Sequence, residues 1–371
     1  MYKKTKRLLS VFMLMLFSLI LLPSNITSAL TYGRLAGNTR YETAKIISGE
    51  FNKADVAILV TGMDYPDALA ATPLAKKYNA PILLTNSKTL DSNALSEIQR
   101  LEVSKVFIVG GTTVIASSIE DKIKSMDIEV ERIAGNNRYE TSVNVANKVG
   151  IENGVFVTTG LNFADSLSAG AIAGILEMPI ILTSGTTLVN SALELVNNTP
   201  KSYVIGGPTI VQDSVVNKLP KCKRIYGSDR YATNKLIIEE FKEHLNFSNA
   251  YVAIGTNFPD ALAGGALAAL NGNAIVLTAV NPSNYTKDII SVNNIQNVTA
   301  LGGTTVLSDN TLNLLDNQFV DENTIMWRAN KTSNFYHDSN ECSNMKSPIQ
   351  ITLKDARELG LKPCTKCNPQ Q

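Results

Sequence analysis

The chain has 371 residues, of which 34 are basic and 33 acidic, so its formal net charge is only +1. This balance argues against a non-specific binder of nucleic acid or of anionic membranes, which is normally strongly basic. The sequence contains only two histidines, His244 and His337. That shortage argues against a zinc hydrolase site and against Ser-His-Asp or Cys-His catalysis.

Residues 1–29 have the layout of a secretory signal peptide. Residues 1–7 carry four lysines and arginines and no acid, an apolar run covers residues 8–22, and small residues precede the expected cleavage after Ala29. The alternative is an uncleaved membrane anchor, although the apolar run is short for about 30 Å of hydrocarbon. Cleavage removes four positive charges and no negative ones, which changes the net charge from +1 to −3. Any anionic partner must then be held at local sites, and no membrane partner is expected.

One motif occurs three times in the chain. It begins as Arg-Leu-Ala-Gly-Asn-Thr-Arg-Tyr-Glu-Thr at residues 34–43 and returns at residues 132–141 and 224–233. Two further landmarks keep step with it: a Gly followed five residues later by Asp, and an apolar run ending in a glycine pair. These landmarks are Gly62/Asp67, Gly160/Asp165 and Gly255/Asp260, then Gly110-Gly111, Gly206-Gly207 and Gly302-Gly303. A unit repeated three times usually supplies binding surface by multiplication.

Within the first repeat, three short runs are typical of strands buried on both faces. Residues 56–61, 81–85 and 105–109 are continuous apolar segments rich in β-branched side chains. Strands that alternate with helices predict a parallel sheet covered on both sides and linked by right-handed crossovers. We therefore predict an α/β fold with three tandem domains of ordinary size. Their expected bounds are residues 32–130, 131–222 and 223–320.

The stretches between these strands predict helices. Residues 93–101 place apolar side chains on one helical face, with Asp91 or Ser92 as the N-cap. Pro73 lies inside another helical stretch, where an interior proline costs roughly 3 kcal/mol. We therefore expect that helix to begin at Pro73, after a separate turn over residues 67–71.

These motifs, in this order, resemble the cell-wall-binding repeat 2 family of Gram-positive surface proteins. The resemblance covers residues 32–317 and implies three Rossmann-like parallel-sheet units in a pseudo-threefold arrangement. It also implies an S-layer-like surface protein, anchored non-covalently to an anionic secondary polymer of the cell wall. The third repeat departs from the pattern, with Tyr226 for Ala, Ser228-Asp229 for Asn-x and Ala232 for Glu. The resemblance therefore gives the least support for ligand contacts made by the third repeat.

Three aspartates are the first candidate ligand-binding residues. Ligands of open α/β sheets bind beyond the carboxyl ends of the strands, where Asp67, Asp165 and Asp260 are expected to lie. The alternative is structural, because an Asp at a strand-to-helix turn can cap the helix or bond its own backbone. No nucleotide cofactor is expected, since neither a G-x-G-x-x-G motif nor a P-loop lysine follows a strand.

Three arginines are the second candidates. A guanidinium group pairs with phosphate or carboxylate in a two-pronged geometry, so Arg40, Arg138 and Arg230 could form a multivalent grip on an anion. The alternative is that each Arg-Tyr-Glu segment makes a salt bridge between repeats, with the aromatic ring packed beside it.

Residues 324–371 no longer follow the repeat. His337, Cys342, Cys364 and Cys367 supply one imidazole and three thiolates, which is a closed ligand set for a structural Zn²⁺ ion. Fewer than fifty residues can scarcely form a stable core without a metal or a disulfide. The alternative is a disulfide between Cys342 and Cys364 or Cys367, as is natural in an exported chain.

The same module predicts one capped helix. Thr352 is the expected N-cap, Asp355 completes a capping box and Gly360 ends the helix. The module resembles the small Cys/His modules that end secreted nucleases and, more loosely, the metal-binding domain of the Ada DNA-repair protein. That resemblance raises a nucleic-acid-binding accessory as one alternative function. The seven basic and six acidic residues between positions 321 and 371 argue against it.

We expect a secreted, non-enzymatic protein that attaches to the cell wall. Some proteins with these repeats carry a murein amidase, and the repeats have been described as amidase modifiers. A wall hydrolase or amidase modifier is therefore the other alternative. Carboxylate-pair chemistry would need two acids brought together by the fold, and the sequence singles out no such pair.

Overall fold

The computed structural model describes residues 30–316, 325–342, 345–364 and 366–367. The expected signal peptide lies outside these residues. No helix in this part of the chain combines the length and the apolar character needed to cross a membrane.

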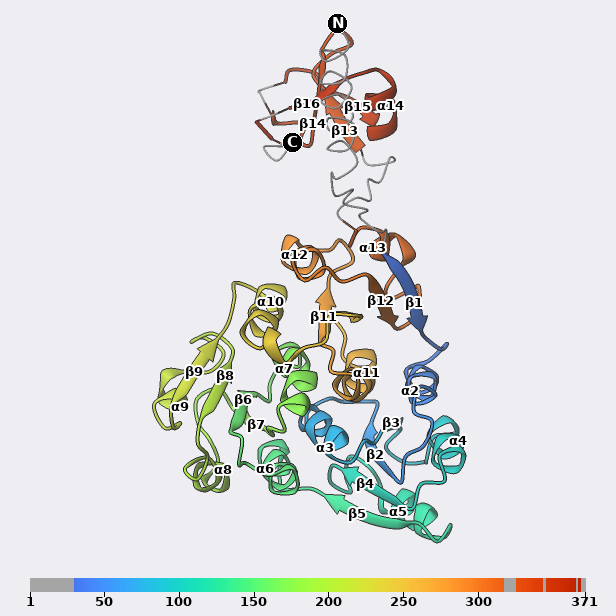
Figure 1. The fold of residues 1–371 in the computed structure, drawn as a ribbon, viewed down its shortest axis with the longest axis vertical. Coiled ribbons are helices and arrows are strands. Elements are labelled where there is room, and N and C mark those ends of the chain that lie inside the picture. Colours follow the sequence, from blue (N-terminus) through green and yellow to red (C-terminus); the bar gives the residue numbers. More distant parts are fainter. Residues whose placement is uncertain (1–29, 317–324, 343–344, 365, 368–371) are drawn as a thin grey trace, which may run out of the picture.

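Three four-stranded sheets, all parallel, form the body of the protein (Figure 1). The first, in the order β3-β2-β4-β5, contains β2 (Val56–Thr61), β3 (Ile82–Thr85), β4 (Lys105–Val109) and β5 (Glu129–Ile133). The second, in the order β7-β6-β8-β9, contains β6 (Val155–Thr159), β7 (Ile180–Thr183), β8 (Ser202–Ile205) and β9 (Cys222–Ile225). The third, in the order β11-β10-β12-β1, contains β10 (Ala250–Ile254), β11 (Ile275–Thr278), β12 (Asn297–Leu301) and β1 (Thr31–Leu35). The predicted α/β fold with three parallel-sheet units is confirmed.

The edge strand of each sheet comes from the start of the following repeat. β5 leads into the second copy of the motif but pairs with β4 of the first sheet, and β9 likewise pairs with β8. β1, at the start of the first repeat, pairs with β12 of the third, from Thr31 opposite Asn297 to Leu35 opposite Leu301. The three units therefore close into a ring. The boundaries expected at residues 130/131 and 222/223 fall inside strands that neighbouring units share.

Three helices pack against one another at the centre of this ring (Figure 1). They are α3 (Ala71–Lys77), α7 (Ala164–Ile175) and α11 (Pro259–Leu270). Glycines let them approach closely, since a Cβ added at Gly170 or Gly265 would lie 3.3 Å or 3.0 Å from the hydroxyl oxygen of Thr72. α7 and α11 are buried on nearly all sides, which matches their almost uniformly apolar sequences.

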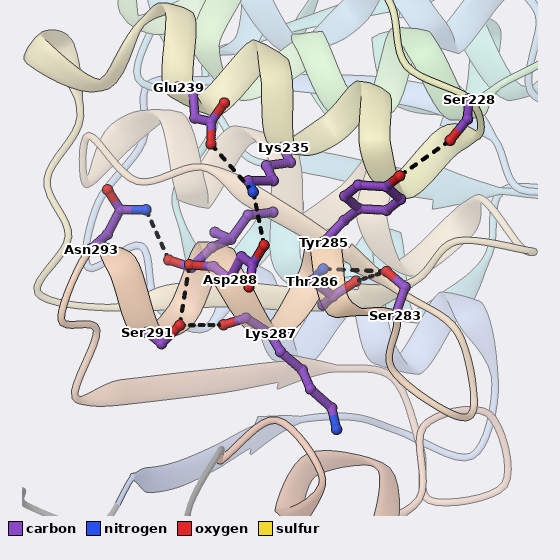
Figure 2. Close-up of polar contacts among 11 residues, drawn as sticks. Ser228, Lys235, Glu239, Ser283, Tyr285, Thr286, Lys287, Asp288, Ser291 and Asn293 are labelled. Carbon is purple, nitrogen blue, oxygen red and sulfur yellow. Dashed lines mark hydrogen bonds and ion pairs between the residues drawn. The ribbon is translucent and has the colours of Figure 1, made fainter. Parts of the chain in front are cut away.

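The remaining helices of the body surround this centre. Three begin at the arginine of the motif: α2 (Arg40–Ser48), α6 (Arg138–Val149) and α10 (Arg230–Glu240). The others are α4 (Ser92–Arg100), α5 (Ser117–Lys124), α8 (Asn190–Val196), α9 (Asp213–Val216), α12 (Asn284–Val292), α13 (Asp309–Asn313) and the short helix η2 (Lys242–His244). Figure 2 shows how α10 is tied to α12, where Lys235 Nζ lies 2.8 Å from Asp288 Oδ2.

The helix after β2 begins earlier than expected. Residues 67–71 were predicted as a separate turn, and Asp67–Ala70 indeed form a short 3-10 helix, η1. The α-helix that follows starts at Ala71 rather than at Pro73, which is its third residue. Proline is tolerated there because the first N–H groups of a helix have no acceptor within the helix. The helix over residues 93–101 is confirmed as α4, with Asp91 as its N-cap.

The C-terminal module forms its own four-stranded sheet in the order β15-β13-β14-β16. Its elements are β13 (Ile325–Arg328), β14 (Phe335–His337), β15 (Ile349–Thr352), α14 (Leu353–Glu358) and β16 (Lys362–Pro363). Among its described residues, five buried side chains make up the core: Met326, Tyr336, Leu353, Ala356 and Leu361. A core this small supports the argument that the module needs a covalent or metal cross-link.

The predicted capping box of the module is confirmed. The Thr352 hydroxyl accepts a hydrogen bond from the Asp355 N–H at 3.0 Å, and Asp355 Oδ2 accepts one from the Thr352 N–H at 3.3 Å. Gly360 follows α14 with φ at +66°, the left-handed conformation that ends many helices.

Candidate functional site

The loops that follow the central strands β2, β6 and β10 meet at one point. Tyr65, Phe163 and Phe258 occupy the same position in these three loops. Their ring centroids lie 5.4, 5.6 and 6.1 Å apart, so each ring contacts the other two. The carboxyl ends of the central strands therefore face the same side of the ring, close to its pseudo-threefold axis.

The Gly-Asn-x-Arg-Tyr-Glu-Thr motif forms a closed loop at the start of each motif helix. In the first repeat, the Thr43 hydroxyl accepts a hydrogen bond from the Gly37 N–H, and Thr39 caps α2. The second and third repeats form the same bond, between Thr141 and Gly135 and between Thr233 and Gly227. All three bonds measure 3.0 Å. This loop holds the arginine that follows it in one defined position.

Each motif arginine donates a hydrogen bond to the glycine that follows the central strand of its own repeat. Nη1 of Arg138, for example, lies 2.6 Å from the Gly160 carbonyl oxygen. Arg40 binds Gly62 and Arg230 binds Gly255 in the same way. No second hydrogen-bond acceptor for these guanidinium groups lies among the described residues. Each guanidinium therefore keeps N–H donors for a ligand.

The three candidate aspartates point toward the glycine pairs. A Cβ added at Gly110, Gly206 or Gly302 would lie 3.3, 3.2 or 2.4 Å from Oδ2 of the aspartate in the same repeat. These glycines also have positive φ angles of +126°, +125° and +105°, which L side chains rarely adopt. The first glycine of each pair is thus required both by the turn and by the approaching carboxylate.

The aspartates are not N-caps. The N-cap residues of η1, α7 and α11 are Pro66, Phe163 and Phe258, and none of them makes a side-chain capping bond. Each aspartate lies instead in the first turn, where a carboxylate interacts favourably with the helix dipole. Their side chains remain directed into the space between repeats.

Each aspartate faces the motif arginine of the following repeat. Arg138 stabilises the charged form of Asp67, Arg230 that of Asp165, and Arg40 that of Asp260. Burial has the larger effect and raises the pKa of all three carboxyls above the ordinary value. None of the three pairs forms a direct ion pair in the described part of the chain. The inter-repeat salt bridge considered from the sequence is therefore absent there.

Three cavities lie at the junctions between repeats and contain these pairs. The 1/2 pocket, with Asp67 and Arg138, has a volume of about 260 Å³. The 2/3 pocket, with Asp165 and Arg230, measures about 400 Å³, and the 3/1 pocket, with Asp260 and Arg40, about 160 Å³. The structure thus gathers the six predicted residues into three Asp/Arg pairs, each shared by two repeats. Neither histidine lines any of these pockets.

A second set of arginines was not singled out from the sequence. Arg132, on β5, donates to the Gly110 carbonyl oxygen at 2.8 Å and pairs with Glu120 at 2.9 Å. Arg34 and Arg224 make the equivalent bonds to Gly302 and Gly206. These arginines fix the glycine pairs that border the pockets. The signal that could have revealed them was the first Arg of the motif, which is present in all three copies.

The four predicted metal ligands converge in the C-terminal module. One ligand atom from each of His337, Cys342, Cys364 and Cys367 lies within 4.8 Å of the other three. Cys342 Sγ and Cys364 Sγ are 3.9 Å apart, and Cys367 Sγ is 3.8 Å from His337 Nδ1. Tetrahedral Zn²⁺ with Zn–S bonds of about 2.3 Å places its ligand atoms about 3.8 Å apart. The group therefore has the composition and spacing to hold a metal ion.

The cysteines form no disulfide bond in this structure. The same holds for Cys222, on β9. A disulfide between Cys342 and Cys364 would require their sulfurs to approach to about 2.05 Å. Burial raises the pKa of the Cys222 thiol, which favours the protonated, less nucleophilic form.

Comparison with protein families identifies the three repeats. Residues 34–120, 132–216 and 224–312 each match the family described as Cell wall binding domain 2 (CWB2). The three matches leave the C-terminal module uncovered.

Two curated relatives come from Bacillus subtilis (strain 168). The chain is 34% identical over 293 residues to the N-acetylmuramoyl-L-alanine amidase LytC. The aligned region covers 78% of this chain and 59% of the amidase. It is 36% identical over 248 residues to a protein named Amidase enhancer. This aligned region covers 66% of the chain and 34% of that protein. The chain thus spans less than two thirds of either relative.

Two solved structures share the fold of the repeats. Cwp6 from Clostridium difficile superposes with a TM-score of 0.72 at 27% identity, over 79% of this chain and 48% of that one. Cwp8 from the same organism gives a TM-score of 0.70 at 29% identity, over 77% and 51% of the two chains. Both matches support the architecture of three parallel-sheet units.

Proposed function

The chain belongs to the Cell wall binding domain 2 family, and on that premise we propose that it is an exported, non-enzymatic anchor. Its three repeats hold an anionic secondary polymer of a Gram-positive cell wall without a covalent bond. The observation that supports this most strongly is the ring of three Asp/Arg pockets, one at each junction between repeats. The same pair of groups is presented three times on one closed ring.

Three weak sites on one body favour a polymer over a small ligand. Once one pocket is occupied, the neighbouring units of the same polymer are held at high local concentration near the others. The guanidinium groups supply unused N–H donors, which suit phosphate or carboxylate oxygens. Because the mature chain has an expected net charge of −3, attraction of an anion must come from these local groups.

We further propose that the C-terminal module holds one structural Zn²⁺ ion. His337, Cys342, Cys364 and Cys367 would complete its coordination and leave no open position for a substrate. When bound, the ion supplies a cross-link between β14, the segment at Cys342 and the C-terminal segment. The module is then a stabilised unit that the wall anchor carries.

Binding to purified cell walls tests the anchor. The protein should be retained on intact walls and released when acid extraction removes the secondary polymers. Retention that survives extraction would rule out the polymer as the ligand. A variant with Arg40, Arg138 and Arg230 changed to Gln should bind more weakly, and the loss should shrink as salt rises because ions screen the charges.

A matched variant controls for net charge. Lys122, Lys218 and Lys242 are exposed and lie outside the three pockets. Changing all three to Gln removes the same three positive charges as the arginine variant. It should leave retention within about twofold of the wild type; an equal loss in both variants would assign the effect to overall charge.

The names of the two Bacillus relatives favour a second candidate, modification of a wall amidase. Release of dye from labelled murein distinguishes the two. The anchor proposal expects no release by the protein alone and no change in the rate of an added amidase. Release by the protein alone would instead make it a hydrolase.

A further inference from the structure

The 2/3 pocket differs from the other two in size and in one side chain. At about 400 Å³ it is the largest of the three. The residue before the first glycine of the motif is Ala36 or Ala134 in the 3/1 and 1/2 pockets, but Tyr226 in the 2/3 pocket. Of these three, only Tyr226 lines its pocket.

The ring of Tyr226 packs against the second glycine of the pair and stays accessible. A Cβ added at Gly207 would lie 3.0 Å from Cδ2 and 3.4 Å from Cε2 of this ring. At the equivalent Gly111 and Gly303, the nearest atom to an added Cβ is 3.9 Å away and is not aromatic. The Tyr226 residue is 47% exposed. It therefore offers an open aromatic surface at the edge of a polar cavity.

A second tyrosine borders the same loop. Tyr285, the second residue of α12, is 39% exposed, and its hydroxyl lies 3.5 Å from Ser228 Oγ (Figure 2). The second residues of the corresponding helices α4 and α8 are Asn93 and Ser191. A tyrosine in contact with the motif loop is thus a feature of the third repeat.

The other departure of this repeat releases a hydrogen-bond donor. In the first repeat, the Glu42 carboxylate accepts a hydrogen bond from the Asn38 N–H, and Glu140 does the same for Asn136 in the second. Ala232 replaces this glutamate in the third repeat. The N–H of Ser228 therefore has no acceptor among the described residues.

We propose that the 2/3 pocket is a subsite for a pyranose ring of the wall polymer, which stacks on Tyr226. This inference rests on the proposed anchoring function. One face of a pyranose carries C–H groups, which are apolar and weakly positive, and the face of an aromatic ring is apolar and weakly negative. The hydroxyl and ring oxygens at the edge of the sugar require polar partners. Ser228 and Arg230 offer N–H donors for them in the same cavity.

The three junctions then have different roles. The 1/2 and 3/1 pockets offer an Asp/Arg pair without an aromatic surface and suit the charged groups of the polymer. The 2/3 pocket recognises the shape of a sugar. Stacking does not depend on net charge, so its contribution should persist at salt concentrations that screen the arginines.

The test compares Tyr226→Ala with Tyr226→Phe, using acid-extracted wall polysaccharide as the probe. Alanine is the natural residue at the equivalent positions Ala36 and Ala134, so the fold accommodates it. We expect Tyr226→Ala to lower the affinity by about five- to tenfold at both low and high salt. Tyr226→Phe keeps the ring and should stay within about twofold. Val292→Ala, at an exposed apolar position in the same repeat, is the matched control.

The outcomes separate this inference from the proposed function. If the wild type does not bind the polysaccharide, the anchoring function fails and the subsite with it. If the wild type binds and the arginine variant loses affinity while Tyr226→Ala does not, the subsite alone is overturned. If Tyr226→Phe loses as much as Tyr226→Ala, the hydroxyl rather than the ring makes the contact, and stacking is overturned.

Discussion

Asp260 of the third repeat shares a pocket with Arg40 of the first, so the two ends of the repeat array meet in one site. Pairing of β1 with β12 creates this contact, because it places the start of the first repeat against the third sheet. The first and last repeats are therefore direct neighbours, and each junction between repeats is built in the same way.

Replacing Gly302 by Ala should be strongly destabilising. Its φ is +105°, and the new Cβ would lie 2.4 Å from Asp260 Oδ2. We expect a loss of about 2 kcal/mol or more in the free energy of unfolding. Gly111→Ala is the matched control, since its Cβ would meet nothing closer than 3.9 Å. Urea unfolding of both variants checks this, and equal stability would mean that the first glycine of the pair is not conformationally required.

Arg34→Ala should weaken the closure of the ring. Arg34 donates to the Gly302 carbonyl oxygen at 2.7 Å and pairs with Asp309, also at 2.7 Å. Removing a charged hydrogen bond to a partly buried carbonyl should cost about 1–2 kcal/mol. Amide hydrogen exchange should then increase first in β1 and β12. An increase confined to the first sheet would contradict the pairing of these strands.

Stability should fall as pH rises through the titration of the three pocket aspartates. Unfolded aspartate titrates near 3.8, whereas burial raises the pKa of Asp67, Asp165 and Asp260 in the folded chain. Between the two values the folded state binds more protons than the unfolded state. The free energy of unfolding therefore decreases with pH across this window. The stabilisation is complete below 3.8 and is lost as pH passes the raised folded pKa.

Replacing the three aspartates by Asn should flatten this dependence. Urea unfolding at a series of pH values from 3.5 upward provides the measurement, with Asp55→Asn, a well-exposed carboxylate, as the control. The same variant should bind an anionic wall polymer more tightly near neutral pH, because three negative charges leave the pockets. An unchanged pH slope would show that burial does not control these carboxyls.

Chelation should unfold the C-terminal module and spare the repeats. The five-residue core is small, so an ion bound to the folded module contributes directly to its stability. We expect one zinc per chain by elemental analysis, and rapid proteolysis within residues 325–367 after chelation. Cys364→Ser should lose the metal, whereas Cys222→Ser, outside the cluster, should retain it. A module that resists proteolysis without metal would contradict the proposed role of zinc.

Local features of the fold could be predicted because they depend on neighbouring residues. The run of apolar residues 56–61 coincides with β2, and the capping box of Thr352 and Asp355 is present as expected. The edge strands could not be assigned in this way. β5 reads Glu-Val-Glu-Arg-Ile, without the continuous apolar run of a central strand, because it lies at an edge and is partly exposed.

The candidate site was predictable in composition but not in pairing. The six residues were recognised because their motifs occur three times. Which aspartate meets which arginine depends on contacts between repeats, and no local pattern encodes them. Tyr226 illustrates the same point. In the sequence it is a departure from the motif, whereas in the structure it rests on Gly207 and lines the largest of the three junction pockets.

The sequence by itself determined the number of units and their α/β character and singled out four candidate metal ligands, because these follow from repetition, hydrophobic runs and ligand spacing. Only the tertiary structure decided that the units share strands, that the ring closes through β1 and that each pocket combines an aspartate and an arginine from different repeats. The physical reason is that these contacts depend on how three small-residue helices pack at the centre. Close packing of distant segments is a property of the folded chain as a whole.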